Sequence, residues 1–157
     1  MSALAFIKVN RLSINELTNL QVKPSQQHLI SDNKDWLEEV LARDESLSFG
    51  IYHNQAAAGL ITLLDPRTTN EDKDHFQPDC LYVWRLMIDQ HHQGKQLGES
   101  AIAFCQQFAT LMGLQGVTLT TMDTEKGNAL SFYLSLGFEP TGRRLDGEIE
   151  LMWRAKR

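Results

Sequence analysis

LYVWRLMIDQHHQGKQLG, residues 81–98, is the stretch that decides the fold of this chain. Its first half is rich in β-branched and aromatic residues, as expected of a strand, and it leads into a short glycine-containing turn at 93–98. The apolar spacing after the turn is that of a helix. Such a junction brings unpaired backbone amides and the positive end of the helix dipole to one point. We therefore predict that this turn holds a phosphate-bearing ligand.

The residues after this junction predict a helix, a strand, a short helix and two strands. Gly113 supplies a left-handed stop for the first helix, and Leu114 can pack back on it in a Schellman motif. Alternation over 117–122 predicts a strand, followed by a helix over about 128–136 and strands from Phe138 and over 147–154. The apolar stripe of the first helix consists of Leu97, Ala101, Phe104, Cys105, Phe108, Leu111 and Met112.

The N-terminal half predicts a strand, two helices and a strand pair. The strand covers 5–9, and the capping-box pattern Ser13–Glu16 opens a short helix through about Leu20. Pro24 interrupts the chain before a second helix over 32–43. Strands 46–53 and 56–64 turn at Asn54-Gln55, and the polar stretch 65–78 is predicted to be an exposed loop.

This order of elements predicts one α/β domain over residues 1–157, with helices packed against a mixed sheet that is antiparallel in its early part. A strand–helix–strand crossover lies in its middle. A 42% hydrophobic content at this length is enough to bury a core.

Composition narrows the classes of partner. The formal net charge of −5 argues against nucleic acid, because nucleic-acid-binding domains usually carry a basic face. No apolar run approaches the length of a membrane helix and no signal-peptide pattern opens the chain, so we expect a cytoplasmic protein without membrane contact. Cys80, Cys105 and His91-His92 lack the spacing of a metal site, and none is predicted.

Two motifs resemble those of the GNAT superfamily of N-acetyltransferases. The family's coenzyme A turn is usually Gln/Arg-x-x-Gly-x-Gly/Ala, and residues 91–96, HHQGKQ, align with it at Gly94. His91 stands where Gln or Arg is common, and Gln96 where Gly or Ala is usual. Downstream, NALSFYLSLGF at 128–138 resembles the family's stretch of Asn, Tyr and a closing Gly-Phe. Softer likenesses, at 20–26, 84–89 and 141–150, point to bacterial spermine/spermidine acetyltransferases.

The resemblance implies a GNAT-like fold: a mostly antiparallel sheet, helices on both faces and a splayed pair of central strands. It also implies acetyl-CoA as co-substrate. Backbone groups of Leu86, Met87 and Ile88 would then bond the pantetheine arm. The pyrophosphate would lie on the turn amides, with Lys95 adding charge and Gln96 in an ordinary helical φ. The implied turn residues are Gln93, Gly94, Lys95, Gln96, Leu97 and Gly98.

The resemblance also assigns roles in the second motif. Tyr133 would protonate the leaving thiolate, after direct attack of a substrate amine on the thioester in a ternary complex. Asn128 would contact the pantetheine arm or the sugar region, or would simply cap its helix. The oxyanion needs a backbone N–H near Met87 or Ile88.

The acceptor implied is a primary amine of a small cationic molecule, and a polyamine such as spermine or spermidine is the preferred candidate. Glu38, Asp89 and Glu148 are the predicted substrate-binding carboxylates, and each is also a candidate for the general base. Trp84 and Arg85 occupy the strand region where some relatives carry a carboxylate base, which argues against a base there.

Alternative interpretations stay open. The acceptor could be another amine, such as an aminoglycoside, an amino acid or a protein N-terminus, because fold does not fix substrate. The chain could also bind acyl-CoA without catalysis, which Gln96 favours and Tyr133 disfavours. An interaction protein that uses the 65–78 loop rests on loop length alone. A homodimer is compatible with the fold, since C-terminal strands of such folds often pair between subunits, but the sequence does not demand it.

Overall fold

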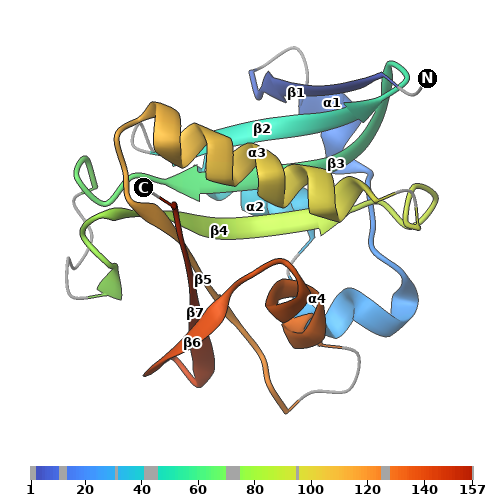
Figure 1. Cartoon of the computed structure of the whole chain (residues 1–157). Coiled ribbons are helices and arrows are strands. Elements are labelled where there is room, and N and C mark those ends of the chain that lie inside the picture. Colours follow the sequence, from blue (N-terminus) through green and yellow to red (C-terminus); the bar gives the residue numbers. More distant parts are fainter. Residues whose placement is uncertain are drawn as a thin grey trace. The chain divides into compact units, whose positions relative to one another are not determined.

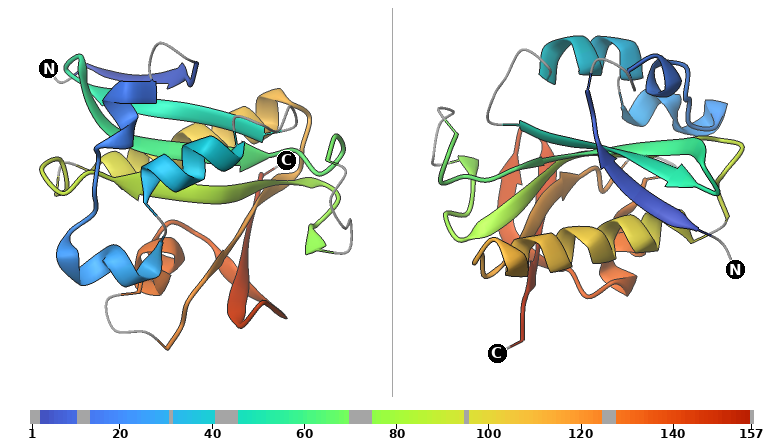
Figure 2. Two further views of the ribbon diagram at one scale, coloured as in Figure 1. Left: turned by 180° about the vertical axis from the view of Figure 1, so that it is seen from behind. Right: turned by 90° about the horizontal axis from the view of Figure 1, so that it is seen from above.

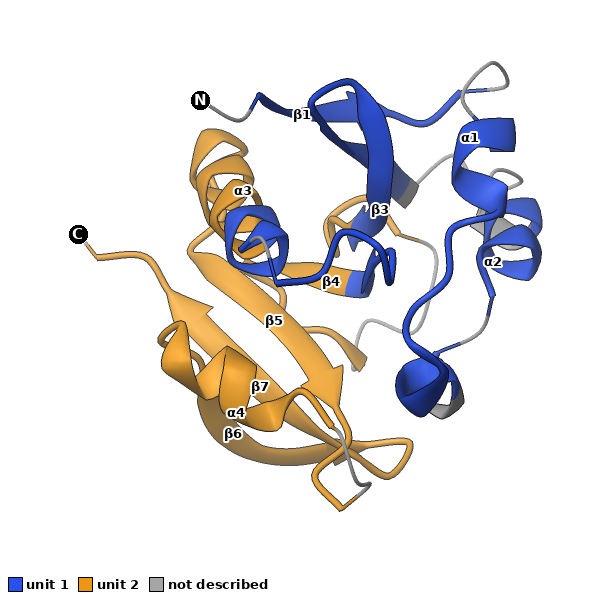
Figure 3. Cartoon of the chain, turned by 90° about the vertical axis from the view of Figure 1, so that its right-hand side faces the viewer, with its two compact units in different colours: residues 1–63, 84–101 blue, residues 64–83, 102–157 orange. Residues whose placement is uncertain are grey.

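The computed structural model describes residues 3–10, 14–30, 32–40, 46–69, 75–94, 96–124 and 128–156 (Figure 1). The chain divides into two compact units (Figure 3). Unit 1 consists of residues 1–63 and 84–101, and unit 2 consists of residues 64–83 and 102–157. Strand β4 (Cys80–Ile88) and helix α3 (Leu97–Leu111) each contribute residues to both units.

Unit 1 is a sheet covered by helices. Its strands are β1 (Leu4–Lys8), β2 (Ser46–His53), β3 (Ala56–Leu64) and the second half of β4, in the order β1-β2-β3-β4. Helices α1 (Ile14–Thr18) and α2 (Asn33–Val40) lie on one face of β1–β3 (Figure 2). A buried cluster joins the helices to the strands; its members include Leu17, Trp36, Leu37, Leu60 and Met87.

The β2–β3 hairpin forms where the sequence predicted it. Both turn residues have positive φ, 51° at Asn54 and 72° at Gln55. Two consecutive positive φ values are those of a type I′ turn, whose twist matches that of the flanking strands.

Unit 2 contains the crossover. Its strands are the first half of β4, then β5 (Gly116–Thr121), β7 (Glu148–Arg154) and β6 (Glu139–Leu145), in the order β4-β5-β7-β6. Strands β4 and β5 are parallel over Cys80–Tyr82, whereas β5–β7 and β6–β7 are antiparallel. The seven strands are thus mixed and mostly antiparallel, which confirms the predicted fold class. Separation of β4 from β5 beyond Tyr82 involves both units and stays a prediction.

Helix α3 ends as predicted. Gly113 has φ 79°, its N–H donates to Thr110 O at 3.1 Å, and the Leu114 N–H donates to Ala109 O at 2.9 Å. These two bonds are those of a Schellman motif. The predicted apolar stripe is wrong at Leu111, which is 83% exposed. Leu111 lies two residues beyond the buried Ala109, and therefore about 200° around the helix from it.

The prediction of an exposed loop over 65–78 is wrong in part, although Arg67, Thr68 and Pro78 are exposed. Asp65 and Thr69 are buried, and so is Phe76, whose ring packs against Tyr82 at 5.0 Å between centroids. Asp65 tolerates burial because Arg67 donates to both of its carboxylate oxygens. The described part of this stretch is therefore partly buried and partly exposed, and residues 70–74 lie outside the described residues.

Two features of the N-terminal half differ from the sequence analysis. Residues 24–29 form a 3₁₀ helix, η1 (Pro24–Leu29), with the proline in its first turn, where a missing N–H costs nothing. Ser13 of the capping box lies outside the described residues, and the Glu16 carboxylate accepts a bond from Tyr52 Oη at 2.8 Å. The predicted end of the second helix, 41–43, also lies outside them.

Candidate functional site

The second half of β4 has one edge paired with β3 and one edge directed away from it. The Asp89 N–H donates to Ala58 O at 2.7 Å, and a Cβ placed on Gly59 would meet the Met87 carbonyl at 2.5 Å. Both groups therefore face β3. Because backbone polar groups alternate in direction along a strand, those of Leu86 and Ile88 point away from β3. Of the three predicted strand residues, these two present their amides and carbonyls at the other edge, whereas Met87 does not.

Asp89 anchors the turn that follows β4. Its residue is 6% exposed, and its Oδ1 accepts the Gln21 N–H at 2.9 Å. Its Oδ2 lies 3.3 Å from both the His91 N–H nitrogen and His92 Nδ1. Burial acts to raise the pKa of Asp89, but these hydrogen bonds outweigh it and hold the pKa below its usual range. Since both oxygens are engaged inside the protein, the geometry favours an anchoring role for Asp89 over substrate binding.

Gln93 ties the same turn to two other segments. Its Nε2 lies 3.0 Å from the Ile88 carbonyl oxygen and 2.9 Å from Gln26 Oε1. The Gln90 N–H donates to Gln21 O at 2.6 Å. The turn is therefore fastened to the end of β4 and to residues 21–26, a segment for which sequence analysis predicted no contact with the turn.

The turn enters α3 through a left-handed residue. Gly94 has φ 81° and Gln96 has φ 59°. The prediction of an ordinary helical φ for Gln96 is therefore wrong. Its carbonyl accepts the Ser100 N–H at 3.1 Å, so Gln96 is the residue at which the chain bends into the helix, and the bend needs the conformation that glycine favours. Leu97 is buried and Gly98 half-buried at the helix start, and Lys95 lies outside the described residues.

A buried cation lies on β4, which sequence analysis did not foresee. The guanidinium of Arg85 sits 5.4 Å from the Trp36 ring, and its Nη2 donates to Asn33 Oδ1 at 2.7 Å. Trp84 meets Trp36 edge-on at 5.1 Å. Burial lowers the pKa of Arg85 to about 10, with Asp32 acting in the opposite direction. Arg85 is still charged at neutral pH and accepts no proton, so the strand offers no base here.

Tyr133 lies in unit 2, on α4 (Leu130–Ser135). It is half-buried, with its ring 5.2 Å from that of Phe132 and 5.9 Å from that of Phe138. Burial raises the pKa of Tyr133, and the neighbouring Cys105 and Glu148 raise it further. The phenol therefore keeps its proton at neutral pH, which a general acid requires.

Asn128 shapes the start of α4. Its Oδ1 accepts the Leu130 N–H at 3.0 Å. The N-cap of α4 is Ala129, so Asn128 stands one residue before the N-cap position that sequence analysis gave it as the simpler alternative to a cofactor contact. The contact of Asn128 with the pantetheine arm or the sugar therefore remains a prediction.

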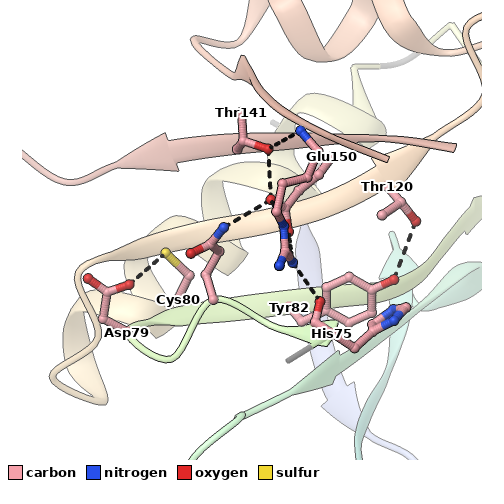
Figure 4. A network of polar contacts seen from close by, with 9 residues as sticks. His75, Asp79, Cys80, Tyr82, Thr120, Thr141 and Glu150 are labelled. Atoms are coloured by element: carbon pink, nitrogen blue, oxygen red, sulfur yellow. Dashed lines mark hydrogen bonds and ion pairs between the residues drawn. The ribbon is translucent and has the colours of Figure 1, made fainter. Parts of the chain in front are cut away.

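The acidic residues of the β6–β7 hairpin have different roles. Glu150 is buried and accepts bonds from Gln77, Thr141 and Arg143, part of the polar network in Figure 4. It is thus committed to the interior of unit 2. Glu148 is half-buried, and burial, followed by the neighbouring Asp146, raises its pKa.

Each unit gathers a different part of the predicted site. Unit 1 holds the strand edge and the turn residues, together with Asp89 and the exposed Glu38 of α2. Unit 2 holds Asn128, Tyr133 and Glu148. Among the described residues, no group of three or more His, Cys, Asp or Glu side chains could hold a metal ion. No helix in the described ranges is long and apolar enough to cross a membrane.

Comparison with known proteins identifies the family. Residues 13–138 match the acetyltransferase (GNAT) family. A 74-residue stretch is 31% identical to N-acetyltransferase 8F1 of Rattus norvegicus, over 47% of this chain. The match spans only 32% of that relative's length.

Solved structures share the fold at low identity. An acetyltransferase from Thermus thermophilus has a TM-score of 0.74 at 17% identity, over 98% of this chain and 97% of that one. The PaiA N-acetyltransferase of Thermoplasma acidophilum, solved with coenzyme A, has a TM-score of 0.70 at 12% identity, over 98% and 99%. A variant of the spermidine N-acetyltransferase SpeG of Vibrio cholerae has a TM-score of 0.66 at 16% identity, over 95% and 91%. The chain therefore belongs to the GNAT family of N-acetyltransferases, enzymes that take their acetyl group from acetyl-CoA.

Proposed function

We propose that this chain transfers acetyl from acetyl-CoA to a primary amine of a small cationic molecule, with a polyamine such as spermine or spermidine as the acceptor. The observation that supports the acceptor class is the half-buried carboxylate of Glu148 on β7, in the same unit as Tyr133. Burial raises the pKa of the Tyr133 phenol most, and the charges of Cys105 and Glu148 raise it further, so Glu148 acts as a negative charge toward the proposed acid. A cationic amine that approaches this phenol meets an opposite charge.

The donor side of the proposal uses unit 1. The amides of the turn 93–98 would bind the pyrophosphate, supported by the dipole of the 15-residue helix α3. Lys95 would add a positive charge. The pantetheine arm would bond the edge of β4 that faces away from β3, through Leu86 and Ile88. Met87 is left out of this contact because its carbonyl faces Gly59 of β3.

The reaction would follow direct attack. The amine nitrogen bonds to the thioester carbonyl carbon, and the Ile88 N–H stabilises the oxyanion that forms. The C–S bond then breaks, and the thiolate takes the phenolic proton of Tyr133. The proton lost by the amine passes to water or to a base.

The amine must lose its proton before it attacks. For a primary amine with a pKa near 10.4, deprotonation at pH 7 costs roughly 4–5 kcal/mol. Arg85 cannot take this proton, because a guanidinium has no acceptor site. Asp89 is already engaged by Gln21, His91 and His92. Glu148 is the favoured base, acting through water, because its pKa is raised toward neutral pH, where a general base works best.

Likeness to polyamine enzymes does not identify the acceptor. Three of the similar structures are variants of the spermidine N-acetyltransferase SpeG of Vibrio cholerae, two of them chimeras with hSSAT, at 15–17% identity. Identity this low speaks for the fold alone. Another structure of similar fold is called an IAA acetyltransferase, from Bacillus cereus, at 13% identity. The proposal therefore depends on the Glu148 charge and must be tested against other amines.

The proposal of acyl-CoA binding without catalysis has lost its main support. It depended on the loss of glycine at Gln96. Since Gln96 adopts the left-handed φ that glycine favours, the geometry of the turn is retained.

The test measures thiol release from acetyl-CoA with spermine, spermidine, putrescine, an aminoglycoside, an amino acid and a peptide amine. Tyr133→Phe should lower kcat by about 10²-fold or more while coenzyme A still binds. Tyr52→Phe is the matched control, because its hydroxyl bonds Glu16 in unit 1. Turnover confined to the amino acid or the peptide would refute the polyamine acceptor. Full activity of Tyr133→Phe would refute the acid.

A further inference from the structure

The Ile88 carbonyl is already bonded from within the protein. It lies at the edge of β4 that faces away from β3, where the pantetheine arm is proposed to bind. Gln93 Nε2 donates to this carbonyl at 3.0 Å. The inference that follows rests on the proposed donor site.

The group that Gln93 presents is chemically the same as the group the cofactor would present. Pantetheine carries amides, and the Gln93 side chain ends in a carboxamide with two N–H donors. The same nitrogen bonds Gln26 Oε1 at 2.9 Å, so both of its hydrogens have an acceptor. The second contact, to Gln26 of η1, therefore helps to hold the Gln93 side chain at the Ile88 carbonyl.

We propose that the Gln93 carboxamide is an internal competitor for the pantetheine arm. Without cofactor it bonds the Ile88 carbonyl. When acetyl-CoA binds, a pantetheine amide takes this carbonyl and the Gln93 side chain leaves. The backbone N–H of Gln93 stays in the turn and is available to the pyrophosphate.

The contact to Gln26 gives this exchange a second consequence. Gln93 cannot leave Ile88 without disturbing its bond to η1, while the turn remains tied to the same segment through Asp89 and Gln21. Binding of the cofactor therefore alters the contact between the turn and η1. Removal of the Gln26 acceptor should loosen Gln93 and ease its displacement.

The first test measures coenzyme A affinity by calorimetry for the wild-type chain, Gln93→Leu, Gln26→Leu and the double variant. Loss of a competing hydrogen bond should tighten coenzyme A binding about two- to tenfold in Gln93→Leu. Gln26→Leu should tighten it less, and the double variant should equal Gln93→Leu, because the two residues act through one contact. Gln90→Leu is the control, being the same substitution in the same turn.

The second test follows the side-chain amide of Gln93 directly. The NMR signals of its NH₂ group, assigned by their absence in Gln93→Leu, should shift and lose protection from hydrogen exchange when coenzyme A is added. Weaker or unchanged binding by Gln93→Leu, or unmoved Gln93 signals in the bound protein, would refute the competitor. Failure of the wild-type chain to bind coenzyme A would instead refute the donor site, and the competitor with it.

Discussion

Replacement of Gln96 by glycine should stabilise this protein. Gln96 has φ 59°, and its side chain is exposed, so the substitution removes few contacts. A residue with a Cβ in the left-handed region is crowded against its own carbonyl, whereas glycine is not. The strain is thus stored in the backbone at the point where the turn enters α3.

The expected rise in the free energy of unfolding of Gln96→Gly follows from two opposing effects. The left-handed conformation costs roughly 1–2 kcal/mol for a residue other than glycine. Glycine gains freedom in the unfolded chain, which offsets roughly 0.5–1 kcal/mol of that. The free energy of unfolding should therefore rise by about 0.5–1 kcal/mol, and Tm by about 1–4 °C for a domain of this size.

The assay is thermal and urea unfolding at neutral pH, with Gln107→Gly as the matched control. Gln107 is also exposed but lies within α3. Glycine inside a helix costs about 1 kcal/mol, so the same substitution should lower Tm there. Coenzyme A affinity of Gln96→Gly should be at least that of the wild type, because the backbone path of the turn is unchanged.

Opposite signs at the two positions are the essential result. If Gln96→Gly lowers Tm as Gln107→Gly does, the residue is not in a left-handed conformation in solution. The left-handed conformation assigned to Gln96 would then be wrong. The argument from Gln96 against a protein that binds acyl-CoA without catalysis would also fail.

Three further substitutions test other parts of the structure. Gln55→Gly should raise the free energy of unfolding by about 0.5–1 kcal/mol, because both residues of its type I′ turn have positive φ; a loss in urea unfolding would contradict the turn type. Asp89→Asn should lower stability by about 1–3 kcal/mol at pH 7. Since the pKa of Asp89 lies below its usual value, the charged carboxylate contributes stability above pH 4. The difference in free energy of unfolding between Asp89→Asn and the wild type should shrink as the pH falls further. A constant difference from pH 7 to pH 3 would contradict this role of the charge. Glu148→Gln should weaken binding of the cationic acceptor and remove the proposed base, seen as a higher KM and a lower kcat. Because burial raises the pKa of Glu148, the free energy of unfolding of the wild type falls as the pH rises through that pKa. The Glu148→Gln variant should therefore be more stable than the wild type at pH 7 and equally stable at pH 3. Equal Tm values of variant and wild type at both pH values would contradict this.

The parts of the fold that local sequence determines were predictable. The turn at Asn54-Gln55 and the helix stop at Gly113 each depend on a few neighbouring residues, and both stand where the sequence placed them. The helix η1 was missed because Pro24 suggests a break, although proline is also a good first residue of a helix. Burial of Phe76 was missed because Phe76 stands in a polar stretch, and nothing in that pattern shows that its ring packs against Tyr82 of β4.

The candidate site likewise has a part that the sequence predicts and a part that it does not. The strand, turn and helix of the proposed donor site follow from a contiguous motif. The contacts that hold this turn do not, since Gln21 and Gln26 are 68 and 67 residues away from their partners Asp89 and Gln93. No pattern within the motif indicates which glutamines meet across such a separation.

One failure of sequence reasoning in unit 1, the backbone conformation of Gln96, has a physical meaning. Positive φ at Asn54 and Gln55 is explained by the hairpin turn that they form. No comparable local preference explains Gln96, where a poor residue for the left-handed region is nevertheless held there. Strained backbone persists only where the surroundings fix it, and such positions concentrate at functional sites. Here the surroundings are the anchored carboxylate of Asp89 and the doubly bonded side chain of Gln93, which together hold the turn in place at the cost of stability that Gln96→Gly should restore.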